Sequence, residues 1–199
     1  AAGRRTRGRC ALDVYGLGPE GGCTVSLTGI LGIDPGVTGA IVLFDPSTSA
    51  LQACPLEHYA YTRDGTNKRR LDYYRLAEDL ASLAVIHGIR AVYLEEVASM
   101  PKQGIASAFS FGQTYGALQG VLAALKLPIA LVTPATWKQA VRCPKDKDGA
   151  RARASQVFPQ HTNLWRRAKD DGVAEAALIA WYGHGHLLLH GHTCNDHRA

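Results

Sequence analysis

The chain has 199 residues, of which 46% are hydrophobic and 20% are charged. This length and apolar fraction predict one ordinary folded domain with tails, and they exclude wholesale disorder. The formal net charge of +5 favours an anionic partner such as nucleic acid, but it fits a basic enzyme equally well. No apolar run approaches the roughly 18 residues of a membrane span, so we expect no membrane partner.

The two ends of the sequence differ from its middle. Residues 1–28 are rich in glycine and arginine and predict an irregular arm, which fits either the end of an organelle transit peptide or a solvated segment. Residues 187–199 predict a flexible tail, which leaves 29–186 as the folded domain. The five cysteines are scattered and form no C-x-x-C pair, which argues against a zinc site and a disulfide framework and favours a reducing compartment.

The first half of the domain predicts three strands and a helix. Short apolar runs at 30–34, 39–44 and 51–59 are separated by brief turns, which is typical of an antiparallel meander. The run 71–87 has leucines at helical spacing and ends at Gly88, a residue that commonly terminates helices.

The second half alternates between helices and strands. Thr133 and Pro134 predict the cap and first position of a short helix. The other expected elements are a strand at 91–97, a helix at 105–125, a strand at 129–132, and helices at 150–157 and 173–182. Antiparallel strands followed by this alternation predict an α/β fold with one mixed sheet flanked by helices.

Acidic residues recur where this fold would bind a ligand. Asp34 ends the first strand, at the sheet edge where α/β proteins bind ligands, although it could also only cap the turn that follows. Glu95 and Glu96 end a buried strand and must point to opposite faces, so only one of them can lie on the face of Asp34.

The last helix begins with a further acidic cluster. Asp171 and Glu175 share one face of that helix, whereas Asp170 lies about 140° from Glu175. Acids in a first turn also suit the helix dipole, which explains Asp170 and Asp171 without a ligand. Carboxylates from two strand ends and one helix start are nevertheless the oxygen donors that Mg²⁺ prefers, and a pair of such ions activates water for attack on phosphorus.

Positive charge is concentrated in one third of the chain. Residues 138–169 contain nine basic and two acidic side chains, which predicts a phosphate-binding surface, with an ordinary solvated face as the alternative. Glycines 112, 116 and 120 recur every four residues on the long predicted helix, and they favour close packing on the sheet or, alternatively, a dimer interface.

These motifs together resemble a known family. The segments Leu31-Gly-Ile-Asp-Pro-Gly-Val-Thr-Gly39 and Leu94-Glu-Glu-Val97 resemble the first and central strands of RuvC-type Holliday junction resolvases, within the RNase H-like superfamily. Phe111-Gly-Gln-x-x-Gly116, Pro134-x-x-Trp-Lys-Gln139 and Asp171-x-x-x-Glu-Ala176 follow in the expected order. The Trp-Lys pair is most similar to the plant chloroplast (monokaryotic chloroplast) members. The resemblance covers about 29–183 and implies an RNase H-like five-stranded sheet.

The resemblance implies an enzyme that resolves four-way DNA junctions as a homodimer. It implies symmetric nicking of two opposing strands with two Mg²⁺ ions per site, for which Mn²⁺ can substitute, held by Asp34, Glu95, Asp171 and Glu175. It also implies a chloroplast nucleoid location after removal of a transit peptide. The residues expected to contact DNA are Lys138, Arg142, Lys145, Lys147, Arg151, Arg153 and Met100, the last as a wedge in place of the aromatic residue that bacterial members have after the central glutamate.

One further departure from the family pattern and three alternative functions remain to be considered. Bacterial members space the last acidic pair as Asp-x-x-Asp, so either Asp170 or Asp171 could be the ligand. A non-catalytic junction-binding nucleoid protein on the same fold is one alternative. Another is a phosphotransferase of the acetate and sugar kinase superfamily, whose phosphate loop also has the D-x-G-x-T pattern of Asp34–Thr38. A ribonuclease acting on RNA–DNA hybrids is the third.

Overall fold

The computed structural model describes residues 27–36, 38–63, 65–97, 104–144 and 147–191. Its five-stranded sheet has the strand order β3-β2-β1-β6-β7. The strands are β1 (Gly29–Asp34), β2 (Ala40–Asp45), β3 (Ala50–Pro55), β6 (Ile89–Glu95) and β7 (Ile129–Val132). The first three are antiparallel, and β1, β6 and β7 run parallel, so the predicted mixed sheet is confirmed.

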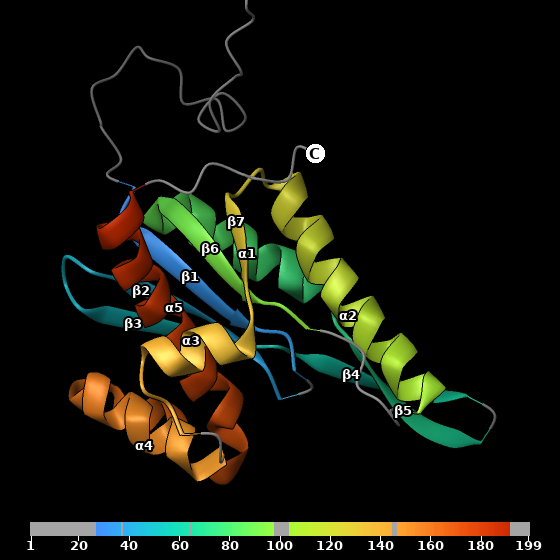
Figure 1. Cartoon of the computed structure of the whole chain (residues 1–199). Helices are drawn as coiled ribbons and strands as arrows, with labels where there is room; N and C mark the ends of the chain where they lie inside the picture. Colours follow the sequence, from blue (N-terminus) through green and yellow to red (C-terminus); the bar gives the residue numbers. More distant parts are fainter. Residues whose placement is uncertain (1–26, 37, 64, 98–103, 145–146, 192–199) are drawn as a thin grey trace, which may run out of the picture.

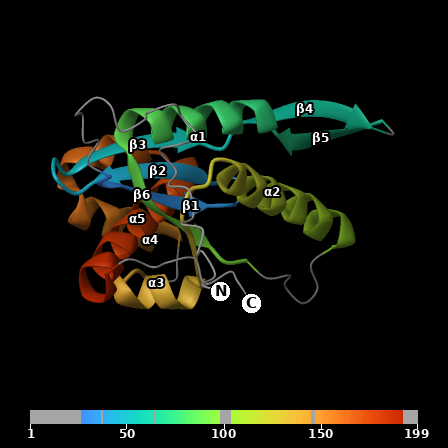
Figure 2. The ribbon, with the colours of Figure 1, turned by 90° about the horizontal axis from the view of Figure 1, so that it is seen from above.

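Helices cover both faces of this sheet. Helices α1 (Tyr73–His87) and α2 (Ile105–Ala124) lie on one face, and α3 (Pro134–Ala140), α4 (Lys147–Val157) and α5 (Asp171–His190) lie on the other (Figures 1 and 2). Strand β1 is therefore buried along its whole length, as a central strand with two covered faces should be. No helix in the described part of the chain has the length and apolar character needed to cross a membrane.

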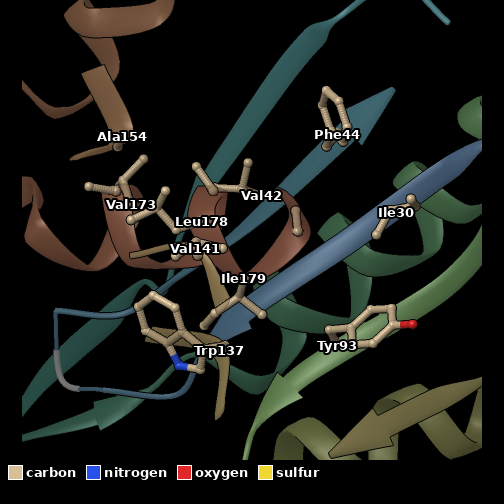
Figure 3. Packing of buried hydrophobic residues seen from close by; sticks show 14 of the residues in the cluster. Ile30, Val42, Phe44, Tyr93, Trp137, Val141, Ala154, Val173, Leu178 and Ile179 are labelled. Atoms are coloured by element: carbon tan, nitrogen blue, oxygen red, sulfur yellow. The ribbon is translucent and has the colours of Figure 1, made fainter. Parts of the chain in front are cut away.

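Helix α5 packs unusually close to β1. A side chain at Gly32 would collide with the backbone of Ala176 and Ala180, so glycine is the residue that permits this approach. The same face holds a core cluster in which Trp137 of α3 and Tyr93 of β6 pack against α5 residues such as Ile179 (Figure 3). This contact sets the start of α5 over the end of β1, where the acidic residues lie.

The helix boundaries follow local sequence signals. The side chain of Asp72 accepts hydrogen bonds from the backbone of Tyr74 and Arg75 and so caps α1, and Gly88 ends that helix at a φ of 58°. Thr133 caps α3 as predicted, with Pro134 at its first position. Two 3₁₀ segments, η2 (Pro159–Trp165) and η3 (Ala168–Asp170), connect α4 to α5.

Three expectations differ from the structure. The predicted third strand, 51–59, ends at Pro55, and the chain then forms a separate hairpin of β4 (His58–Arg63) and β5 (Thr66–Leu71). Residues 187–190, assigned to the flexible tail, continue helix α5, and Leu187 is buried because it packs in the core. The glycine stripe of α2 does not face the sheet, since a side chain at any of its three positions would meet open space. The predicted arm, apart from 27–28, and the tail beyond 191 lie outside the described residues.

Candidate active site

Asp34 sits in a turn that holds its carboxylate beneath α5. The backbone N–H of Gly36 donates a 2.9 Å hydrogen bond to its Oδ1, and the side chain is buried. Gly172, the second residue of α5, is so close that an added Cβ would lie 2.9 Å from Asp34 Oδ2. Strand β1 and helix α5 therefore bring the first and last acidic motifs together.

Glu95 ends the neighbouring parallel strand β6 and is also buried. The indole Nε1 of Trp137, a fully buried side chain on α3, donates a 2.9 Å hydrogen bond to Glu95 Oε1. Glu96 is exposed and points away from the face of Glu95, as strand alternation requires. Burial and, after it, the charge of Glu96 raise the pKa of Tyr115 on α2, the helix that covers that other face. Of the two adjacent glutamates, only Glu95 shares the face of Asp34.

Helix α5 supplies the remaining two carboxylates. Asp171 Oδ1 accepts a hydrogen bond of 3.3 Å from the hydroxyl of Thr38, in the loop that follows Asp34. One turn later, Glu175 Oε1 accepts a 2.7 Å charged hydrogen bond from Lys138 Nζ. The Lys138 ammonium also lies 5.1 Å from the centre of the Trp137 ring. Helix α3 thus contacts two of the four carboxylates through consecutive residues.

Asp170 plays a different part from Asp171. Both of its oxygens accept hydrogen bonds from the Arg167 side chain, and one also accepts from the Arg167 backbone. These bonds hold the pKa of Asp170 below its ordinary value. Asp170 is therefore engaged as a helix cap and ion-pair partner, while Asp171 faces the loop of Asp34.

The four carboxylates lie close enough for their charges to interact. Burial, together with the charges of Glu95, Glu175 and Asp171, raises the pKa of Asp34 to about 7 against the opposing hydrogen bond from Gly36. Burial also raises the pKa of Glu95, and the charge of Glu175 adds to that rise, against the opposing effect of Trp137 and Lys138. Since the other three carboxylates all act on the pKa of Asp34, Asp34, Glu95, Asp171 and Glu175 form one electrostatic cluster.

Lys138 offsets part of this negative charge. Its partial burial alone would lower its pKa, but the hydrogen bond and charge of Glu175, with the charge of Glu95, outweigh burial and raise the pKa above the ordinary value. The ammonium therefore stays protonated and stands where positive charge is needed. One lysine facing four acids leaves a net negative site.

The oxygen donors of this cluster suit a divalent cation, but the side chains are not arranged as a preformed metal site. No group of three Asp, Glu, His or Cys side chains among the described residues is arranged to hold a metal ion as it stands. The donors are nevertheless carboxylate oxygens, which hard cations prefer, and a cation would neutralise the charges of Glu95, Glu175 and Asp171 that, after burial, raise the pKa of Asp34. The assignment of these four residues as metal ligands stays a prediction.

Four of the predicted DNA-contacting residues have described side chains, and these side chains have different surroundings. Lys138 belongs to the carboxylate cluster, and Arg142 lies beside it at the rim of a hollow of about 620 Å³ on α3. Arg151 is paired with Asp148 within α4, and Arg153 donates a 2.6 Å hydrogen bond to the carbonyl of Val141, which links α4 to the end of α3. Met100, Lys145 and the side chain of Lys147 lie outside the described part of the chain.

Three residues contribute to the site in ways that the sequence motifs do not predict. Thr38 and Trp137 belong to the motifs that resemble the family, but no individual role is predicted for them, and Gly172 belongs to no predicted site. For Trp137 a signal exists, because it follows a capped helix start directly after strand β7. No local pattern marks Gly172, whose role depends on a contact with the loop at Thr38.

Replacing Trp137 with phenylalanine is expected to lower both stability and activity. The change leaves a buried carboxylate oxygen without its donor, which costs about 1–3 kcal/mol, and it frees Glu95 to change orientation. Trp165→Phe is the matched control, because that indole donates a 2.9 Å bond to the neutral hydroxyl of Ser155. Urea unfolding should show both variants destabilised, whereas an assay for the nuclease activity that the resemblance implies should show a loss for Trp137→Phe alone. Equal activity losses would contradict a specific role for the Glu95 contact.

Comparison with known proteins supports the fold. No protein-family model and no curated protein sequence matches the chain. Thermus thermophilus RuvC in complex with a Holliday junction substrate has a TM-score of 0.53 at 16% identity, covering 82% of this chain and 97% of that one. A second Thermus thermophilus RuvC structure has a TM-score of 0.50 at 17% identity, with 81% and 96% covered. The yeast mitochondrial Holliday junction resolvase Ydc2 has a TM-score of 0.45 at 12% identity, with 83% and 86% covered. The chain therefore has the same fold as the two Thermus thermophilus RuvC structures.

Proposed function

We propose that this protein is a divalent-metal-dependent endonuclease that resolves four-way DNA junctions by paired nicks. The observation that carries the proposal is the coupled cluster of Asp34, Glu95, Asp171 and Glu175. It lies at the carboxyl ends of β1 and β6, where α/β folds bind their ligands. The shared fold with a RuvC that was solved on a Holliday junction substrate supports DNA junctions as the substrate class.

The four carboxylates would hold two Mg²⁺ or Mn²⁺ ions, which supply Lewis-acid activation of water and neutralise charge at the phosphodiester. The chain's own residues set the geometry for this. The Gly36 N–H binds one oxygen of Asp34, and the Trp137 indole binds one oxygen of Glu95, so the second oxygen of each carboxylate would be available to an ion. Lys138, held protonated by Glu175, places a positive charge where a DNA phosphate would approach.

Phosphate contacts on this side of the site would come from α3. Arg142 is exposed and lines, with Lys138 and Gln139, the hollow next to the carboxylate cluster. Arg153 would instead hold α4 in place, because its guanidinium binds the carbonyl of Val141, and Arg151 is already paired with Asp148 within α4. Binding of junction DNA should weaken as salt rises, since each phosphate contact releases counterions.

Paired nicks require two active sites, and we propose that a homodimer provides them. Gly112, Gly116 and Gly120 lie on the solvent face of α2, and a side chain at each would meet open space. An exposed helix face of small residues allows close approach of a second copy. Gly116→Arg should therefore yield a monomer by light scattering, and an unchanged mass would contradict this interface.

A cleavage assay tests the proposed activity. A synthetic four-way junction, labelled in turn on each strand, should be nicked on two opposing strands when Mg²⁺ is present and on none with EDTA. Linear duplex of the same sequence is the control substrate, and an RNA–DNA hybrid tests the ribonuclease alternative. Tight junction binding without cleavage in Mg²⁺ or Mn²⁺ would favour a non-catalytic binding protein instead.

A further inference from the structure

A second basic groove lies on the side of the active site away from α3. It is a hollow of about 460 Å³ between the β4–β5 hairpin and the first half of α2. The hairpin and this end of α2 project together from one end of the molecule (Figures 1 and 2). The residues used below are Pro35, Tyr61, Lys68, Arg69, Arg70 and Phe109, all of which line the groove.

The wall of the groove formed by β5 is positively charged. Lys68, Arg69 and Arg70 are consecutive on that strand, and no acidic residue is among the described residues that line the hollow. Lys68 and Arg69 are exposed, and Arg70 lies 5.1 Å from the centre of the Tyr61 ring. This charge attracts a polyanion and fits the phosphates of a nucleic acid strand.

The groove also presents an aromatic ring to solvent. Phe109 on α2 is 67% exposed, although a phenylalanine is normally buried, whereas Tyr61 on the hairpin is half-buried beneath Arg70. Exposed rings beside cations are the combination that binds single strands, because unstacked bases pack on the rings while the cations hold the backbone. Bases inside a duplex are stacked on each other and cannot reach such rings.

One end of the groove meets the active site. Pro35 lines the hollow and directly follows Asp34 in the turn that carries the first carboxylate. A strand lying in the groove would therefore run to the carboxylate cluster. We propose that this groove binds an unpaired segment of the DNA strand beside the cut, with Phe109 stacking on its bases and Lys68 and Arg69 contacting its phosphates. The position beside the cut rests on the proposed nuclease function, whereas single-strand binding does not.

Fluorescence anisotropy with labelled oligo(dT) of 20 nucleotides, in EDTA, tests the binding itself, with a 20-base-pair duplex as the second probe. Phe109→Ala should weaken oligo(dT) binding by about tenfold, as expected for the loss of one stacked base, and should change duplex binding less than twofold. Arg69→Glu should weaken oligo(dT) binding at least as much. Lys126→Glu is the matched control, because this lysine is exposed at the far end of α2 and should change neither affinity.

Several outcomes would overturn the groove. One is that the natural protein does not bind oligo(dT), and another is that the groove variants lose affinity for the duplex and for oligo(dT) equally. The others are that Lys126→Glu loses affinity for oligo(dT), or that the natural protein binds oligo(U) more tightly than oligo(dT). Circular dichroism of each variant checks that it is folded. If the natural protein cuts no junction but the variants lose oligo(dT) binding as stated, single-strand binding in the groove is supported and the proposed nuclease function is refuted. If junctions are cut and both groove variants bind oligo(dT) normally, only single-strand binding in the groove is refuted.

Discussion

Asp34→Asn is expected to abolish junction cleavage while stabilising the metal-free protein. Asparagine keeps the size of the side chain, and its oxygen can still accept the Gly36 hydrogen bond. It removes the charge that a cation would need, so cleavage should fall by about 100- to 1,000-fold or more, as when one charge-stabilising group is lost from an active site. Binding of the junction in EDTA should persist, because the substituted residue contacts no phosphate.

The stabilisation should depend on pH in a definite direction. In the unfolded chain the Asp34 carboxyl ionises near 3.8, but in the folded protein its pKa is about 7. Below pH 3.8 the Asp34 carboxyl is protonated in both states, so its ionisation does not affect the free energy of unfolding. Between 3.8 and 7 the folded state retains a proton that the unfolded state has lost, so the free-energy penalty of the natural aspartate grows with pH and then stays constant. Above pH 7 the penalty is about 4 kcal/mol, at 1.36 kcal/mol for each pKa unit.

Urea unfolding in EDTA at pH 5 and pH 8 measures this effect. Asp34→Asn should unfold at higher urea than the natural protein, and the gain should be larger at pH 8. Asp170→Asn is the control and should unfold at lower urea than the natural protein. Arg167 lowers the pKa of Asp170, and their ion pair stabilises the fold above that pKa. A natural rate of cleavage by Asp34→Asn, or a loss of stability at pH 8, would refute the charge cluster as the site.

The sequence predicted the central sheet because its signals are local. Strand β7 has the predicted bounds Ile129–Val132, and α3 begins at the predicted Thr133–Pro134 cap. Both signals depend on residues within a few positions of each other. The convergence of Asp34 and Glu95 also followed from the strand order, since acids at the ends of neighbouring parallel strands lie at the same edge.

The hairpin β4–β5 was missed although its turn had a recognisable signal. Asp64-Gly65 lies between two runs of alternating residues, and Gly65 has the positive φ of 69° that such turns require. The apolar run at 51–59 was interpreted as one strand, which hid the break between Pro55 and His58. The missed element matters because it carries the basic wall of the groove against α2.

Other features depend on contacts between distant parts of the chain. Asp170 and Asp171 are adjacent in sequence but have different partners. The Arg167 side chain binds both oxygens of Asp170, whereas Asp171 accepts a hydrogen bond from Thr38, which lies far away in the sequence. Arg153 counts toward a basic segment in the sequence, yet its guanidinium binds the carbonyl of Val141. Charge composition predicts that a surface is basic, but it does not tell which cations pack inward.

Gly172→Ala should disrupt both folding and catalysis, because this glycine separates the loop of Asp34 from the start of α5. An added Cβ would collide with the carbonyl oxygen of Thr38 and would lie 2.9 Å from Asp34 Oδ2. The Thr38 contact is with backbone and cannot be relieved by turning a side chain. Either α5 or the loop must shift, at a cost of about 1–3 kcal/mol, and both carry carboxylates of the cluster.

Gly185→Ala on the same helix is the matched control. A Cβ there meets nothing within 4 Å, and replacing glycine by alanine in a helix interior gains up to about 1 kcal/mol. Urea unfolding should thus move in opposite directions for the two variants, and junction cleavage should fall only for Gly172→Ala. If Gly172→Ala cuts junctions at the natural rate, the loop of Asp34 tolerates displacement from α5. The four carboxylates would then not need the close approach of β1 and α5 on which the proposed chemistry depends.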